Sequence, residues 1–150
     1  MANTYTSINH HYIFSTKNRA PSIVGNFRER LHAFMGGVAR ENRMTARCVG
    51  GVSDHVHLLV SMPTTLSIAR SIQLIKGRSS IWVHESFPEM QNFAWQEGYG
   101  AFSVSISHLA ATVAYIENQE EHHRRRSFQE EYISFLKKHG IEYDEKYLWD

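Results

Sequence analysis

Residues 44–62 read MTARCVGGVSDHVHLLVSM, and this stretch decides the fold. Two runs of strand length, residues 44–49 and 52–62, flank Gly50 and Gly51. Glycines between two such runs are typical of a turn that joins neighbouring strands. The stretch therefore predicts a β-hairpin with a glycine turn, although the pattern does not fix the residue at which the turn closes.

Helices are expected on both sides of this hairpin. Before it, apolar residues recur at the spacing of one helix face: Phe27, Leu31, Phe34, Met35 and Val38. This predicts a helix over 26–42 that begins with a capping box between Asn26 and Glu29. After the hairpin, the same spacing returns at Ile68, Ile72, Ile75, Ser79 and Trp82. This predicts a second helix, capped by Thr64 or Thr65.

Two more strands and two more helices complete the pattern. Residues 8–15 and 99–105 alternate their side chains as half-buried strands do. Ser105 or Ser107 can cap a third helix that runs to about His122. The buried face of that helix holds Leu109, Val113 and Ile116. A fourth helix stops before Gly140, and its apolar residues are Phe128, Tyr132, Phe135 and Leu136.

The order β-α-β-β-α-β, followed by two helices, is that of a ferredoxin-like two-layer sandwich of the α+β class. Its sheet is expected to be antiparallel, with the first two helices on one face and the other face free for a ligand. At 150 residues the chain is long enough for one core and too short for two. Residues 1–150 are therefore expected to form one domain.

The composition, 42% hydrophobic and 21% charged, excludes a disordered or collagen-like chain. Cys48 is the single cysteine, so no internal disulfide can form and a reducing cytoplasm is expected. No apolar run approaches a membrane span, and the first residues carry no signal-peptide pattern. We therefore expect a cytoplasmic protein without a membrane partner.

A formal net charge of +1 does not by itself indicate a nucleic-acid-binding protein. The charges are unevenly placed, however, because four acidic residues lie in the last ten positions and Arg124, Arg125 and Arg126 form a basic block. Ten histidines are the one compositional excess. The chemistry of the protein is therefore sought among its histidines.

Residues 54–60, DHVHLLV, hold the densest chemical signal. Because side chains alternate along a strand, His55 and His57 share one face. Two neutral imidazoles on one face can chelate a divalent metal, but two ligands rarely suffice and a third has to come from elsewhere. The alternative is a half-exposed strand with two polar outward positions, and the His-x-His pattern alone does not decide between the two.

Residues 115–119, YIENQ, lie on the expected third helix. Positions i and i+4 of a helix face the same way, so the Tyr115 hydroxyl and the Gln119 amide can converge on one point. Neither residue belongs to the buried apolar stripe of that helix. Read alone, the pair is more typical of a boundary tyrosine that is hydrogen-bonded to a surface glutamine.

Together with the histidine pair, these residues resemble those of the HUH endonucleases. The similarity is to the single-tyrosine transposases of insertion-sequence 200/605-like elements and to the REP-associated tyrosine transposases. It runs over nearly the whole chain, through HHYIFSTKNRAP at 10–21, LIKGRSS at 74–80, WQEGYGAFSVS at 95–105, YIENQEEHH at 115–123 and GIEYDEKYLWD at 140–150. The resemblance implies that His55 and His57 bind a metal, that Tyr115 is the nucleophile and that Gln119 is the third metal ligand.

The resemblance implies a transposase, which is a metal-dependent single-stranded DNA endonuclease and strand transferase acting on hairpin-bearing DNA ends. A phenol is a suitable nucleophile because the 5′-phosphotyrosine intermediate can be attacked in turn, which rejoins the strand. The implied cofactor is Mg²⁺ or Mn²⁺, which lowers the barrier by polarising the phosphate. The implied active form is a homodimer, in which the tyrosine helix commonly crosses to the partner subunit.

Two other functions fit the same residues. One is a domesticated or non-catalytic nucleic-acid-binding module with an inert Tyr115, and the other is a phosphodiesterase that uses water and forms no covalent intermediate. Tyr99 is the rival nucleophile, although it lacks a partner four residues on. The sequence does not identify a general base for Tyr115. His122 is a candidate, although its position is more typical of a DNA-facing or capping residue. His10 is a candidate extra ligand, and Lys76 and Arg78 are candidate DNA contacts.

Overall fold

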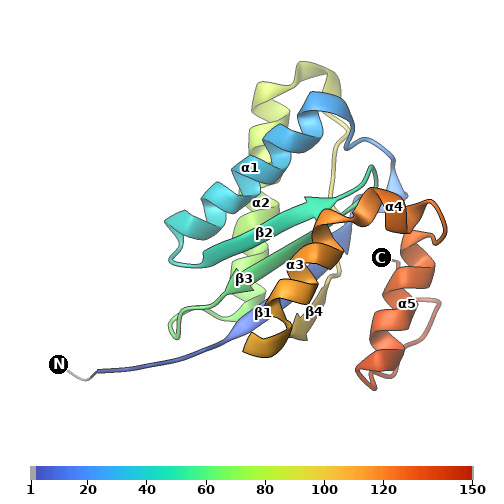
Figure 1. Cartoon of the computed structure of the whole chain (residues 1–150). Helices are drawn as coiled ribbons and strands as arrows, with labels where there is room; N and C mark the ends of the chain where they lie inside the picture. Colours follow the sequence, from blue (N-terminus) through green and yellow to red (C-terminus); the bar gives the residue numbers. More distant parts are fainter. Residues whose placement is uncertain (1–2, 150) are drawn as a thin grey trace.

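The computed structural model describes residues 3–149. Within this range, four strands form one antiparallel sheet. The strands are β1 (Asn9–Ser15), β2 (Thr45–Gly51), β3 (His55–Ser61) and β4 (Gly100–Ser103), and their order across the sheet is β2-β3-β1-β4. Helix α1 (Gly25–Glu41) follows β1, and α2 (Ile68–Ser86) lies between β3 and β4 in the chain. This connectivity and strand order confirm the predicted ferredoxin-like α+β fold (Figure 1).

Three further helices follow the sheet: α3 (Leu109–Glu117), α4 (Gln119–His123) and α5 (Phe128–Lys138). The connections also contain the short 3-10 helices η1 (Lys17–Arg19), η2 (Pro88–Met90) and η3 (Ile106–His108). Among residues 3–149, no helix is both long enough and apolar enough to cross a membrane.

The second face of the sheet is covered, so the prediction that it is free for a ligand is wrong. Figure 1 shows α1 and α2 on one side of the sheet and α3 and α5 on the other. The physical reason is the apolar stripe of α5, which packs on Ile13 of β1 and Phe102 of β4 through Phe128, Tyr132 and Leu136. A ligand therefore has to reach the sheet between these C-terminal helices.

Side-chain alternation along the central strands separates two cores. On one face, residues of β1 and β3 pack with α1 and α2, and these are Tyr12, Phe14, Val56, Leu58 and Val60. Ile13 of β1 belongs to the other face, and it pairs with His57 of β3 in the antiparallel register. His55, two residues before His57, shares that face because the strand period is two. The histidine pair thus lies between the sheet and the C-terminal helices.

The two glycines of the hairpin lie inside β2, so the predicted glycine turn is wrong. Gly50 pairs with His57 and Gly51 pairs with Val56, and residues 52–54 connect the two strands. A Cβ atom at position 50 would lie 2.7 Å from Cγ2 of Ile116 on α3. Gly50 therefore serves the close approach of a helix to the strand.

The first two helices begin at caps other than those predicted. Helix α1 has Val24 as its N-cap without a side-chain hydrogen bond, and no capping box forms between Asn26 and Glu29. Gly25 enters this helix with a φ of 59°, a conformation that glycine adopts without strain. Helix α2 begins after Ser67, whose hydroxyl accepts a hydrogen bond from the backbone N–H of Arg70 at 3.1 Å.

Candidate active site

His55 and His57 on β3 are both fully buried, so the half-exposed strand considered as the alternative is wrong. Each ring is held at its Nδ1 atom. Nδ1 of His55 lies 2.7 Å from Oδ1 of Asp54, and Nδ1 of His57 lies 2.8 Å from Nε2 of His11. Partners of this kind orient a histidine so that its other nitrogen can bind a metal.

The predicted third helix breaks at Asn118, where φ is −99° and ψ is 24°. Helix α3 therefore ends at Glu117, and α4 begins at Gln119. The Gln119 side chain is buried, and its Oε1 lies 3.2 Å from Nε2 of His55. Its Nε2 donates a hydrogen bond to the backbone carbonyl of Tyr115 at 3.2 Å. The structure thus brings Gln119 next to the histidine pair.

Tyr115 lies one helical turn before Gln119, and its hydroxyl reaches the same cluster. The hydroxyl donates a hydrogen bond to Oε2 of Glu131 and lies 3.2 Å from Nε2 of His122. The ring centroids of Tyr115 and His57 are 5.8 Å apart. A single chain therefore brings the histidine pair, the glutamine and the tyrosine together.

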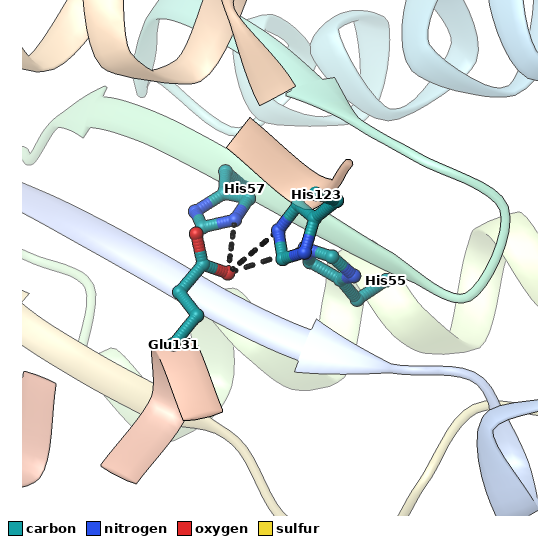
Figure 2. A group of neighbouring side chains, drawn as sticks. All are labelled: His55, His57, His123 and Glu131. Atoms are coloured by element: carbon teal, nitrogen blue, oxygen red, sulfur yellow. Dashed lines mark hydrogen bonds and ion pairs between the residues drawn. The ribbon is translucent and has the colours of Figure 1, made fainter. Parts of the chain in front are cut away.

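Two residues of this cluster, Glu131 and His123, were not expected from the sequence. Figure 2 shows the Glu131 carboxylate directed at three imidazoles. Its Oε1 lies 3.1 Å from Nε2 of His57, 3.2 Å from Nε2 of His123 and 3.3 Å from Nε2 of His55. The signal that could have found Glu131 is its place three residues after Phe128, on the apolar face of the fourth helix, where a carboxylate is unusual.

The residues of the cluster fit a divalent metal. His55, His57, His123 and Glu131 each offer one ligand atom, and these atoms all lie within 4.8 Å of one another. Imidazole nitrogen and carboxylate oxygen are both common ligands of divalent ions. The metal implied by the resemblance therefore has a suitable donor set among the described residues.

Burial and charge pairing shift the pKa values of the cluster in different directions. Burial opposes ionisation of Glu131, but hydrogen bonds from the histidines hold the pKa of its carboxyl well below the usual range. Burial lowers the pKa of His55, but hydrogen bonds to Asp54 and Glu131 outweigh this and raise that pKa to about 9. Burial lowers the pKa of His57, and burial with the Glu131 charge raises the pKa of Tyr115. The site thus holds an anionic carboxylate beside a protonated phenol.

A cavity of about 160 Å³ opens beside Tyr115 and Glu131, and Arg126 and Lys138 line it as well. A second cavity of about 360 Å³ shares Phe135 and Lys138 with the first and extends along β4 and η3. Two cationic side chains beside the Tyr115 hydroxyl favour the approach of an anion. A phosphate group can therefore approach the tyrosine from this side.

The other residues singled out in the sequence lie elsewhere. Nδ1 of His10 is 3.3 Å from the hydroxyl of Tyr12, on the side of the sheet that faces α1 and α2. His11, which faces the opposite way, contacts His57 in its place. The Lys76 ammonium donates hydrogen bonds to the carbonyls of Gln96, Glu97 and Gly98 and so holds the loop before β4. Tyr99 lies beside the same ammonium, which is 5.7 Å from its ring centroid.

Comparison with protein families matches residues 4–119 to the family described as "Transposase IS200 like". Over 119 residues the chain is 25% identical to the ISDra2 transposase TnpA of Deinococcus radiodurans, and the match covers 76% of this chain and 85% of that relative. Over 126 residues it is 23% identical to the transposase for insertion sequence element IS200 of Salmonella typhimurium. That match covers 81% of this chain and 82% of the relative.

Solved structures share the fold. A protein described as a transposase from Deinococcus radiodurans R1 matches with a TM-score of 0.66 and 24% identity, over 79% of this chain and 95% of that one. A REP-associated tyrosine transposase bound to a REP hairpin matches with a TM-score of 0.60 and 15% identity, over 82% and 73%. Since the family match spans residues 4–119, which is most of the length of this chain, the chain belongs to the IS200-like transposase family.

Proposed function

We propose that this transposase cleaves and rejoins single-stranded DNA, with Tyr115 as the nucleophile and with a divalent metal bound by His55, His57 and Gln119. One observation supports this most directly, namely that a single carboxylate, Glu131, contacts the Tyr115 hydroxyl and both histidines. A nucleophile and metal ligands have to lie within a few ångströms of the same phosphate to act on it together.

Attack by tyrosine keeps the strand cleavage reversible. The phenolic oxygen of Tyr115 forms a bond to phosphorus, and the bond from phosphorus to the 3′-oxygen breaks. The phenolic proton passes to a neighbouring acceptor, and Nε2 of His122 is within reach at 3.2 Å. The leaving 3′-oxygen takes up a proton and becomes a free hydroxyl. A 3′-hydroxyl that attacks the 5′-phosphotyrosine reverses these steps and joins the strand again.

The donor set bears on which metal is used. A bound divalent ion supplies positive charge that polarises the scissile phosphate and stabilises the charge developing on it. Mg²⁺ prefers oxygen ligands, whereas imidazole nitrogen suits transition-metal ions. His55 and His57 therefore favour Mn²⁺ over Mg²⁺.

We propose that the DNA partner is a single strand next to a hairpin. The REP-associated structure with the same fold was solved with a REP hairpin. In this chain, Arg126 and Lys138 line the cavity at Tyr115, where they can pair with phosphates beside the scissile bond. Phe135, shared by both cavities, offers its ring to an unstacked base. Because the substrate is the DNA of a bacterial-type cell, we place the reaction in the cytoplasm.

We further propose a homodimer in which each active site forms within one subunit, because Tyr115 contacts the Glu131 and His122 of its own chain. Co-refolding a His57→Ala chain with a Tyr115→Phe chain tests this arrangement. Sites within single subunits predict no cleavage by the mixture. Covalent product on the His57→Ala chain would instead show that the tyrosine helix crosses to the partner subunit.

The proposed activity is tested with Mn²⁺ and single-stranded oligonucleotides that cover inverted repeats flanking the gene. The wild type should form a protein–DNA complex that survives denaturing electrophoresis. Tyr115→Phe removes one hydroxyl, so it should lose this complex and keep nearly the same affinity for the hairpin. Cleavage without a covalent complex would indicate attack by water. Hairpin binding without any cleavage would indicate a non-catalytic binding module.

A further inference from the structure

Glu131 occupies a position that a carboxylate rarely holds. It lies on α5 with 1% of its surface exposed. A capping box between Ser127 and Glu130 fixes the start of this helix, and Phe128 and Tyr132 pack the same face into the core over the sheet. Burying a charged group is costly unless it is paired and hydrogen-bonded. The position of Glu131 therefore depends on what its two oxygens contact.

The two oxygens of Glu131 contact different parts of the site. Oε1 lies 3.1, 3.2 and 3.3 Å from the Nε2 atoms of three histidines (Figure 2). Oε2 accepts a hydrogen bond from the Tyr115 hydroxyl and lies 3.2 Å from Nε2 of His122. One carboxylate thus spans the distance between the metal-binding histidines and the nucleophile.

The three imidazoles around Oε1 are arranged as metal ligands are. Their Nδ1 atoms already have partners, which are Asp54, His11 and the backbone carbonyl of Arg126. Their Nε2 atoms all lie within 3.3 Å of Oε1 of Glu131. Those of His55 and His123 also lie 3.2 and 2.9 Å from Oε1 of Gln119. A histidine that binds a metal usually has its second nitrogen held in this way. If these contacts served only to form an ion pair with the Glu131 carboxylate, one of the three histidines would suffice.

Glu131 and His123 both lie outside residues 4–119, so the family match does not assign them a role. We propose that Glu131 is both a metal ligand and a catalytic residue, with Oε1 binding the divalent ion held by His55 and His57 and Oε2 holding the Tyr115 hydroxyl beside it. The role of Glu131 at the Tyr115 hydroxyl rests on the proposed function, in which Tyr115 is the nucleophile.

A bridging carboxylate would fix the distance between nucleophile and metal, and such positioning contributes strongly to the rate of a bond-forming step. Glutamine at position 131 would keep the size of the side chain. It would offer one carbonyl oxygen and one NH₂ group, and the NH₂ group cannot bind a cation. Glu131→Gln should therefore break one side of the bridge with little change in volume.

The ligand role is tested by calorimetric titration of the full chain with Mn²⁺ alone. Glu131→Gln should bind Mn²⁺ at least about tenfold more weakly than the wild type, as the loss of a ligand or its support does. Glu121→Gln is the matched control, because Glu121 is exposed on α4 and pairs with Arg124 at 2.9 Å. It removes the same charge and should leave the affinity unchanged. Equal Mn²⁺ affinity of Glu131→Gln and the wild type would overturn the ligand role.

The role at Tyr115 is tested by the rate of covalent complex formation at saturating Mn²⁺. Glu131→Asp keeps the charge but is one methylene shorter, so it cannot reach the metal and the hydroxyl together. It should retain more Mn²⁺ affinity than Glu131→Gln and still form the covalent complex much more slowly than the wild type. If Glu131→Gln does not fold, the rate of covalent complex formation is compared between Glu131→Asp and the wild type instead. Faster complex formation by either variant would overturn the proposal and show that α5 shields the site.

The two proposals fail in different ways. If the wild type forms no covalent complex through Tyr115, the proposed function fails, and the Mn²⁺ titration still decides whether Glu131 is a ligand. If the wild type forms the complex and Glu131→Gln matches it in both rate and Mn²⁺ affinity, only the role of Glu131 is overturned.

Discussion

Gly50 on β2 and Ile116 on α3 approach so closely that no side chain fits between them. A Cβ atom at position 50 would lie 2.7 Å from Cγ2 and 2.8 Å from the carbonyl oxygen of Ile116. Tyr115 is the preceding residue of α3, so this contact sets the position of the proposed nucleophile above the sheet. Gly50→Ala should push α3 outward, lower the free energy of unfolding by about 1–3 kcal/mol and reduce the yield of covalent complex.

Gly77→Ala is the matched control for this substitution. Gly77 lies inside α2, and a Cβ atom there would have no heavy atom within 4 Å. Alanine should raise the free energy of unfolding by about 0.5–1 kcal/mol, since it is the better helix former. Denaturant unfolding and denaturing gels check both variants. A Gly50→Ala protein as stable and as active as the wild type would contradict the close packing of α3 on β2.

The three proposed metal ligands, His55, His57 and Gln119, should differ in importance for cleavage. His55→Ala and His57→Ala should each abolish cleavage, because an imidazole ligand is lost from the centre of the cluster. Gln119→Ala should reduce the rate about tenfold, since water can partly replace an amide oxygen. EDTA should abolish cleavage by the wild type, and added Mn²⁺ should restore cleavage. Full activity in EDTA would rule out a metal role for all three residues.

Lys138 should contact the phosphates of the strand. Lys138 lines both cavities, whereas its neighbour Lys137, which is exposed as well, lines neither of them. Lys138→Gln should weaken binding of a single-stranded oligonucleotide and reduce the slope of log affinity against log salt by about one. Lys137→Gln should leave that slope unchanged. Fluorescence anisotropy at several salt concentrations measures both, and identical slopes would exclude the cavities as the path of the strand.

His32 on α1 should make the fold less stable in mild acid. Burial and the nearby Arg28 charge lower the pKa of His32 from 6.5 to about 4, and its Nε2 has no hydrogen-bond partner among residues 3–149. The unfolded chain therefore binds this proton more readily, and stability is lost as pH falls from about 6.5 towards 4.

His32→Leu should remove this part of the pH dependence. Between about pH 7.5 and pH 5.5, its free energy of unfolding should fall by about 1 kcal/mol less than that of the wild type. Chemical denaturation at the two pH values measures this difference. The same pH dependence in both proteins would show that His32 titrates normally in the folded chain.

The fold class was predictable because its signals are local. The helical spacing from Phe27 to Val38 and the alternation in residues 8–15 each depend on neighbours in the sequence. The position of the hairpin turn was predicted wrongly for a non-local reason. Position 50 requires glycine because Ile116, which is distant in the sequence, packs too close for a side chain there. The covering of the second face was missed because an apolar stripe on α5 indicates a buried face without indicating what buries it.

The site was predictable only in part. Strand alternation placed His55 and His57 on one face, helix spacing paired Tyr115 with Gln119, and the resemblance joined the two motifs. Glu131 was missed because its position beside the histidines depends on how α5 docks on the sheet, which no local pattern encodes. The break of the third helix at Asn118 was missed as well, and Gln119, which contacts His55, directly follows this break.

The covalent link between protein and DNA tests the proposed chemistry most directly. The complex formed with Mn²⁺ and a flanking single-stranded oligonucleotide is digested with nuclease and protease, and the nucleotide-bearing peptide is sequenced by mass spectrometry. We expect a 5′-phosphonucleotide on the hydroxyl of Tyr115 and a free 3′-hydroxyl on the released strand. A nucleotide on Tyr99, or cleaved DNA with no modified peptide, would contradict Tyr115 as the nucleophile.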